Sequence, residues 1–205
     1  MRYTKIPETT FQELQLNAGV LLSEFDPETG TVDLSAILGA TTGDNGFSAT
    51  PEYSDFGEDI NNAPKNMKEL KQLDNWTVEM TGTYVTVDAN AVKSLIGAAD
   101  IDASNQTHIV PRNDLHDEDF TDLWWVGDYS DKNGATNGGY LAIHMMNTLS
   151  TGGFSIASTD GGKGNFAFTY TAHYSMEEQE TVPFEVFIKA GGEEATGEDE
   201  GEVTA

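Results

Sequence analysis

The segment 123–175 constrains the fold more than any other, because it holds four apolar or alternating runs that are separated by turn-forming residues. Gly, Asn and Asp are concentrated in the breaks between the runs. Alternation with a period of two among aromatic and β-branched residues, bounded by such breaks, is typical of half-buried antiparallel strands. We therefore expect four consecutive strands, over residues 123–129, 140–149, 154–159 and 166–175.

The last of these runs has two chemically different faces. Phe166, Phe168 and Tyr170 alternate with small or hydroxyl-bearing residues, and Tyr174 continues the aromatic side. A slip of one residue would expose every ring on that side, so the register is strongly constrained. We expect these aromatic rings in the core, together with the first tryptophan of the run 123–129 and a leucine of the helix described next; the predicted core is Trp124, Phe166, Phe168, Tyr170 and Leu95.

The rest of the chain predicts further strands and one helix. Residues 88–99 contain an apolar stripe that includes Leu95, with Asp88 placed to cap the first turn and Gly97 to end the helix. A helical turn capped by Asp33 is expected over 33–38. The other expected elements are a central strand in 14–25, an edge strand in 47–53 that contains Pro51, a short helix in 66–73, a strand in 76–88 and a last strand in 181–189, with Val182, Phe184, Val186 and Ile188 on one side.

These elements predict one mainly β domain, an antiparallel sandwich or barrel with one flanking α-helix, over residues 1–190. Residues 1–13 are expected to form an N-terminal arm. The stretch 191–205 carries six acidic residues and no basic one, and its composition predicts a disordered tail.

Charge limits the function classes that are open to this chain. It has 35 acidic and 10 basic residues, a formal net charge of −25. Such a chain offers few cations to neutralise phosphates, so binding of nucleic acid through counterion release is not expected. It contains no cysteine and no apolar run long enough for a membrane span, so neither thiolate chemistry nor membrane insertion is predicted.

Candidate sites for catalysis or metal binding are weak. The cluster 116–119 contains His116 followed by three acids, but adjacent ligands lack metal-site spacing, and a solvated acidic loop is the better interpretation. His173 and Ser175 lie two residues apart without the elbow motif of a serine hydrolase. Paired carboxylates of a glycosidase stay open, because their separation in space decides that chemistry. We expect no catalytic residue, metal or cofactor.

Several segments taken in order resemble the major tail (tail tube) proteins of long, non-contractile-tailed phages and prophages of Gram-positive bacteria. The resemblance extends over residues 16–189, and the ordered set carries it rather than any single motif. The matching stretches are 16–22 with 25–27, 39–43 with 47–51, 62–66, 76–83, 91–102 and 122–134.

The resemblance implies a β-sandwich with one helix, in a hexameric ring whose inner strands join into one shared barrel. Stacked rings would form a tube in the virion, assembled in the cytoplasm of the bacterial host. The implied partners are further copies of the chain, a tape-measure protein, the tail terminator and distal tail proteins, and genomic DNA that passes through the lumen without specific binding. The family brings no catalytic residue.

On this interpretation Thr169 and Thr171 are expected to face the lumen. Lys65, Lys68 and Lys71, spaced by three, form a basic face that is expected to contact an acidic surface on another copy. The long polar loops 26–46 and 131–139, with Thr41 and Asn133, are expected to join one ring to the next. The alternatives are a capsid decoration or tail accessory protein, and an acidic β-sandwich enzyme or carbohydrate-binding module.

Overall fold

The computed structural model describes residues 6–7, 9–129 and 138–191 of the chain. In this part the chain is mainly β, with antiparallel pairing throughout and one α-helix, as predicted. The strands are β1 (Gln15–Leu22), β2 (Gly46–Asp55), β3 (Lys71–Tyr84), β4 (Ala99–Ile101), β5 (Ile109–Pro111), β6 (Thr121–Tyr129), β7 (Gly139–Ser150), β8 (Phe166–Ala172) and β9 (Phe184–Lys189). The α-helix is α1 (Ala89–Ile96), and the short 3-10 helices are η1 (Thr10–Gln12), η2 (Leu34–Ala36), η3 (Lys68–Leu70) and η4 (Asp117–Asp119).

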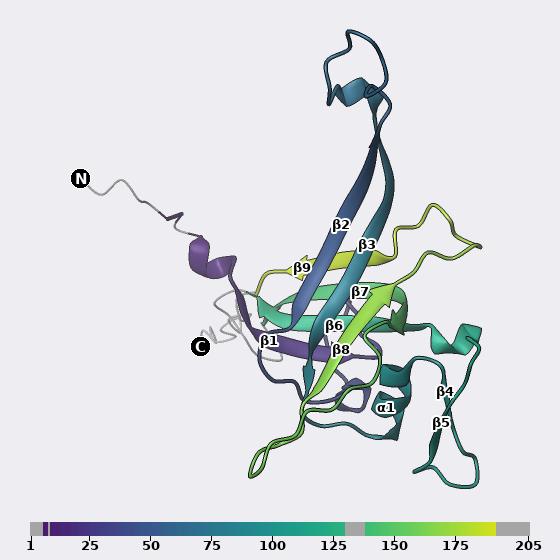
Figure 1. Cartoon of the computed structure of the whole chain (residues 1–205). Coiled ribbons are helices and arrows are strands. Elements are labelled where there is room, and N and C mark those ends of the chain that lie inside the picture. The colour runs from purple at the N-terminus through teal and green to yellow at the C-terminus, as the bar shows by residue number, and fades with distance from the viewer. Residues whose placement is uncertain (1–5, 8, 130–137, 192–205) are drawn as a thin grey trace, which may run out of the picture.

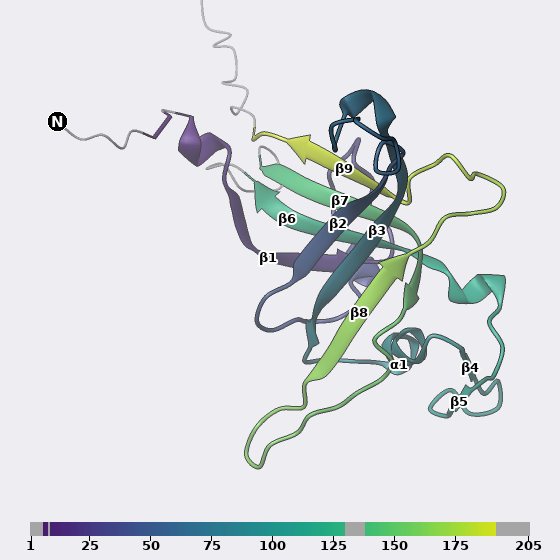
Figure 2. The same ribbon diagram turned by 45° about the horizontal axis from the view of Figure 1, so that its top comes forward.

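Strand β7 belongs to both layers of the domain. The main sheet has the order β1-β6-β7-β8-β3-β2, and β9 also pairs with β7. Residues 140–145 of β7 pair with β9, whereas 148–150 pair with β8. The sheet therefore divides into a layer of β1, β6, β7 and β9 and a second layer of β8, β3 and β2 that crosses it (Figures 1 and 2).

The switch between layers occurs at Asn147, whose φ of +50° lies in the left-handed region that asparagine tolerates better than most residues. Its backbone amide donates a hydrogen bond to the carboxylate of Asp122 over 3.1 Å. The register with β6 shifts beside it, between Thr121 and Leu123. Strands commonly change sheet at such local irregularities.

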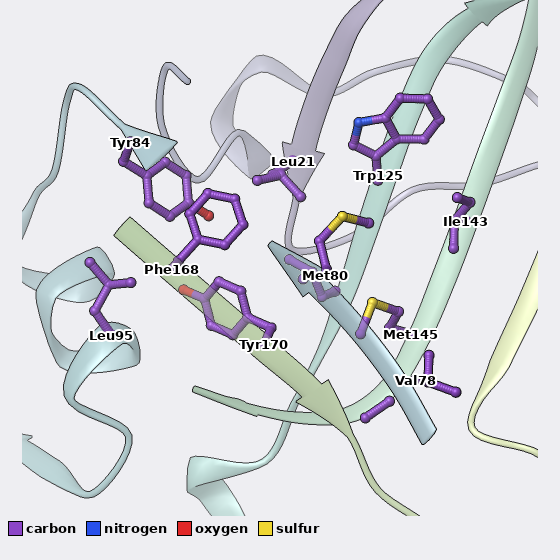
Figure 3. Packing of buried hydrophobic residues seen from close by; sticks show 12 residues of the cluster. Leu21, Val78, Met80, Tyr84, Leu95, Trp125, Ile143, Met145, Phe168 and Tyr170 are labelled. Atoms are coloured by element: carbon purple, nitrogen blue, oxygen red, sulfur yellow. The ribbon is translucent and has the colours of Figure 1, made fainter. Parts of the chain in front are cut away.

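The main core lies between the two layers (Figure 3). It contains residues from β1, β3, β6, β7 and β8 together with Leu95 of α1. The rings of Tyr84 and Phe168 have centroids 4.5 Å apart, and both side chains are buried. Apolar burial of this kind stabilises the fold by roughly 25 cal/mol for each Å² removed from water.

The helix α1 has the ends that the sequence predicts. The side chain of Asp88 accepts a hydrogen bond of 2.7 Å from the amide of Ala91, and Gly97 closes the helix with a φ of +85°. The Ser150 hydroxyl donates to the carbonyl of Leu95 over 2.9 Å, which ties the helix to the end of β7. Beside α1, the hairpin of β4 and β5 lies apart from the two layers (Figure 1).

A second apolar cluster covers the other side of the β1-β6-β7-β9 layer. The segment 23–38 folds across this side, and Phe25 and Ala36 pack against Trp124 and Ala142. Within the segment the amide of Ser23 donates to the carbonyl of Ala36, and the amide of Leu38 donates to the carbonyl of Leu21 in β1. Much of the loop 26–46 is therefore a cover for Trp124, not a free connection that could be shortened without cost.

Two strand predictions need correction. Strand β1 is an edge strand, not a central one, because β6 is the one strand of the sheet that it pairs with over the described residues, and its register is irregular between Leu16 and Val20. The run 154–159 forms no strand, since a single bridge from Ala157 to Asn165 is all the pairing that it has. Its side chains Phe154 and Ile156 are exposed, so the apolar run had no layer to pack against.

The last two runs also differ from the prediction. Strand β8 ends at Ala172, and Tyr174 is 39% exposed, with its hydroxyl accepting a hydrogen bond from the amide of Trp76. Val186 and Ile188 of β9 are 47% and 62% exposed, although Phe184 packs against the core. Val186 and Ile188 do lie on the same side of β9 as Phe184, as the alternation predicts, but the layer of β8, β3 and β2 does not extend over this part of β9.

Candidate functional site

The outward side of β2, β3 and β8 forms a surface that we call the hydroxyl face. Inward residues of these strands, such as Val78, Met80 and Phe168, are buried, so the residues that alternate with them point away from the core. The face has seven hydroxyl-bearing residues and two carboxylates: Ser48, Thr50, Thr77, Thr81, Thr83, Thr169, Thr171, Glu52 and Glu79. Asn75 and Ala167 complete it.

The antiparallel register brings these side chains into rows across the three strands. Thr81 pairs with Thr169, and Glu79 lies between Ser48 and Thr171. The Thr171 hydroxyl is also 2.7 Å from that of Thr151. Neighbouring hydroxyls and carboxylates can thus satisfy one another along the face, as Thr77 does by donating to Glu52 over 3.2 Å.

The charge of the hydroxyl face is negative, since Glu52 and Glu79 are its charged members and neither lysine nor arginine occurs among the residues that define it. Most contacts between proteins and DNA are made to phosphate and sugar, and lysine and arginine supply the attraction. A polyanion would therefore meet hydroxyl groups on this surface but no basic side chain that could bind its phosphates.

The structure gives the predicted core residues two different environments. Phe168, Tyr170 and Leu95 are buried between the layers, and Phe166 packs against the margin of that core. Trp124 is buried in the second cluster, under the segment 23–38, where its ring stacks on His144 with centroids 4.0 Å apart.

Strands β2 and β3 continue beyond the rest of the sheet as a hairpin, whose tip projects away from the two layers (Figure 1). Asp55 organises the base of this tip by accepting hydrogen bonds from the amides of Gly57 and Asn66, at 2.9 and 3.0 Å. These bonds lower the pKa of the Asp55 carboxyl. Exposed apolar side chains surround the tip: Tyr53, Phe56, Ile60, Met67 and Leu73.

The three lysines lie at this tip, but not on one face of a helix. The helix expected over 66–73 is reduced to η3, and Lys71 already belongs to β3. Lys68 is 3.6 Å from Glu69, and the ammonium of Lys71 lies 5.1 Å from the centre of the Tyr53 ring. Lys65 precedes η3 in the exposed part of the tip.

The predicted loop residues differ in what can be said of them. Thr41 forms a bridge with Tyr84 at the end of β3, and its hydroxyl accepts a hydrogen bond of 3.1 Å from Asn45. It is therefore attached to its own subunit and only partly accessible. Asn133 lies outside the described residues.

The cluster 116–119 contains one buried group that the sequence did not reveal. The carboxylate of Asp119 has no exposed side-chain area, and Arg112 donates to both of its oxygens, at 2.6 and 2.9 Å. Burial opposes ionisation of Asp119, but bonds from the His116 amide and from Arg112 hold its pKa below the ordinary value. Arg112 also contacts Asp100 at 2.9 Å, so this group joins η4 to the β4-β5 hairpin.

The other candidates from the sequence do not form a catalytic arrangement. His173 lies just after β8, and its Nδ1 is 3.2 Å from the carbonyl of Asn147, while its ring packs edge-on against Phe120. Within residues 6–7, 9–129 and 138–191, no group of three or more histidine or acidic side chains has the arrangement of a metal site.

Among the described residues, two strands of the main sheet leave one edge open, since β2 pairs only with β3 and β9 only with β7. The other side of β1 is partly bonded to the segment 36–38, through the bridge from Leu22 to Ile37. An open edge presents unpaired backbone groups and can accept a strand from another chain. Pro51 in the sequence had suggested an edge for β2, whereas β1 had been predicted as a central strand.

No protein-family model matches this chain. A search of curated proteins finds no significant similarity. Over the described residues, no helix has the length and apolar character that are needed to cross a membrane.

Proposed function

We propose that this chain is a tail tube subunit, a structural protein that polymerises as stacked rings into the tube of a long, non-contractile phage tail. The proposal joins the resemblance over residues 16–189 to the one observation that supports it most, the hydroxyl face. A three-stranded surface of short hydroxyl-bearing side chains with a weak negative charge suits the wall of a channel for DNA.

In this proposal β2, β3 and β8 belong to the inner barrel, and the hydroxyl face lines the lumen. Thr169 and Thr171 then face the passing DNA, and Phe168 and Tyr170 anchor the wall from behind. Six copies form a ring, and their pooled strands form one wide barrel with a polar interior.

The edges and the hairpin supply the means of assembly. A head-to-tail contact between different edges closes into a ring when its rotation fits. The hairpin tip extends beyond the layers and presents exposed apolar side chains together with Lys65 and Lys68, so it suits a contact with the next ring. Further partners of such a tube are a tape-measure protein inside it and the terminator and distal tail proteins at its ends.

Electron microscopy of the purified chain, combined with light scattering over a range of concentration and salt, tests this function. We expect rings and tubes at high concentration. Assembly is expected to improve with salt, because each copy carries a net charge of −25 and screening shortens the range of repulsion. A chain that stays monomeric under every condition contradicts the proposal, and a closed trimer would favour a decoration or accessory protein.

A further inference from the structure

Strand β9 presents an uncovered apolar strip. Val186 and Ile188 are 47% and 62% exposed, and both lie on the side of β9 that faces the main core. Their partners across the register, Ile143 and Leu141 of β7, belong to that core or pack against it. The strip therefore continues the apolar surface of the core beyond the point where β2 and β3 cover it.

The same strand has an open edge. Within the described residues β9 pairs with β7 on one side and with no strand on the other. Proteins usually protect such edges with charge, proline or a short irregular strand. Here the open edge adjoins two exposed aliphatic side chains, a combination that favours addition of another strand.

The N-terminal arm has the sequence of a suitable partner. Residues 1–7 contain Arg2 and Lys5 and no acidic residue, in a chain that otherwise has a large acidic excess. The stretch 176–189, which includes β9, has four acidic residues and one basic residue. Opposite charges of this kind favour encounter and fix orientation between two surfaces.

The described part of the arm also leads away from its own subunit. The described residues 9–14 lead outward from β1, and η1 lies outside both layers (Figures 1 and 2). Ile6 is 70% exposed. Pro7 cannot donate to a β ladder, so strand addition is limited to the six residues before it, the same length as β9.

We propose that residues 1–6 of one copy add as a strand to the open edge of β9 in a neighbouring copy, and that an arm residue covers Val186 and Ile188. This rests on the proposed self-assembly and names the contact that would connect neighbours. The occupant is a second copy because the acidic stretch 176–189 complements the basic residues of the arm and because the described residues 9–14 lead away from the body that carries them.

Pairwise crosslinking tests the contact directly, because the chain contains no cysteine. Full-length Ile6→Cys protein is mixed with full-length Ile188→Cys protein and treated with a short bismaleimide. We expect a heterodimeric product several-fold more abundant than that from Ile6→Cys mixed with Thr107→Cys, where the second thiol lies on the exposed loop between β4 and β5. Equal yields from the two mixtures would overturn the inference.

Two changes test the chemistry at constant ionic strength. Arg2→Glu with Lys5→Glu in the Ile6→Cys chain is expected to lower the yield several-fold, whereas Arg2→Lys with Lys5→Arg keeps the charge and the yield. Val186→Thr in the Ile188→Cys chain is expected to lower it as well, because the substitution keeps the shape but removes apolar area. A crosslinking yield that is the same with and without the charge-reversing and the Val186→Thr substitutions would contradict the proposed partner.

The double variant Ile6→Cys with Ile188→Cys distinguishes contact between copies from contact within one copy. Linked chains support the proposal, and a crosslinked monomer alone would show that the arm covers its own β9. Micrographs of the unmodified protein separate the two hypotheses. Tubes without the crosslink would support the tail tube function and contradict this inference. The crosslink without rings or tubes would contradict the function and support the contact.

Discussion

The guanidinium of Arg112 lies 2.6 Å from the carboxylate of Asp119, whose side chain is completely buried beside the β4-β5 hairpin. One guanidinium nitrogen, Nη2, donates to both carboxylate oxygens, at 2.6 and 2.9 Å, so the contact is a charge-assisted hydrogen bond shared between them. Neither residue belongs to the hydroxyl face, so the pair is structural and its loss is a test of the fold.

Replacing Arg112 with methionine is expected to destabilise the protein, because it leaves the buried carboxylate of Asp119 without its counter-charge. Denaturant unfolding of Arg112→Met should show a clear fall in the midpoint. The matched control is Asp100→Asn, which removes the more exposed partner of the same arginine and is expected to have a much smaller effect. Similar midpoints for Arg112→Met and the wild type would show that the pair contributes little.

Stability is expected to fall in acid as two carboxylates of this region become protonated. Bonds from the side chain and backbone of Ser104, with help from His108, lower the pKa of Asp102 to about 2, and the pKa of Asp119 is also lowered. A carboxyl whose pKa is depressed by folding contributes stability that is present above its unfolded pKa of about 4 and is lost as the pH falls through the folded value. The free energy of unfolding, measured between about pH 5 and pH 2, should fall most steeply at the acid end of this range. Asp102→Asn should flatten the lower part of that profile, and an unchanged slope would contradict the assignment.

Gly82 is expected to tolerate no side chain. A Cβ at this position would overlap the ring of Phe168 and lie 2.5 Å from the side chain of Asn45. Overpacking in a filled core costs about 1–3 kcal/mol, so Gly82→Ala should lower the free energy of unfolding by that amount. Gly164→Ala is the control, since its Cβ would meet neighbours at ordinary distances of 3.6 to 3.8 Å. Equal stability of the two variants would show that the core rearranges freely around β3.

Lysines at Thr169 and Thr171 are expected to slow the passage of DNA without preventing tube assembly. Both residues lie on the hydroxyl face and outside the core, and cations there would hold phosphates. The measurement is DNA ejection from particles across a salt series, with the largest delay at low salt. Ala103→Lys with Gln106→Lys adds the same number of cations in the exposed loop between β4 and β5 and serves as the control. If the Thr169 and Thr171 variant ejects DNA like the parent at low salt, these threonines do not line the channel.

Removal of residues 191–205 is expected to leave the fold intact. The deleted stretch has six acidic residues and no basic one, so the net charge changes from −25 to −19. Thermal unfolding should be unchanged, and polymerisation should become easier because repulsion between copies falls. A large loss of melting temperature would show that the tail packs on the domain.

The sequence by itself determined the elements whose signals are local. The two-faced pattern of 166–172 identified β8 and its buried side, and Asp88 and Gly97 marked the ends of α1. Alternation and capping depend on residues a few positions apart, so no knowledge of distant contacts is needed. The hydroxyl side of β8 was predicted for the same reason.

Tertiary structure decided which apolar runs obtained a partner. The run 154–159 has the composition of a strand but remains a loop, and Val186 and Ile188 alternate correctly yet lie beyond the cover of β2 and β3. The assembled hydroxyl face also depends on pairing of β3 with both β2 and β8, and the latter begins more than eighty residues later in the chain. Burial of Asp119 required Arg112 to be placed beside it by the β4-β5 hairpin. These outcomes follow from packing between distant segments, which local periodicity does not encode.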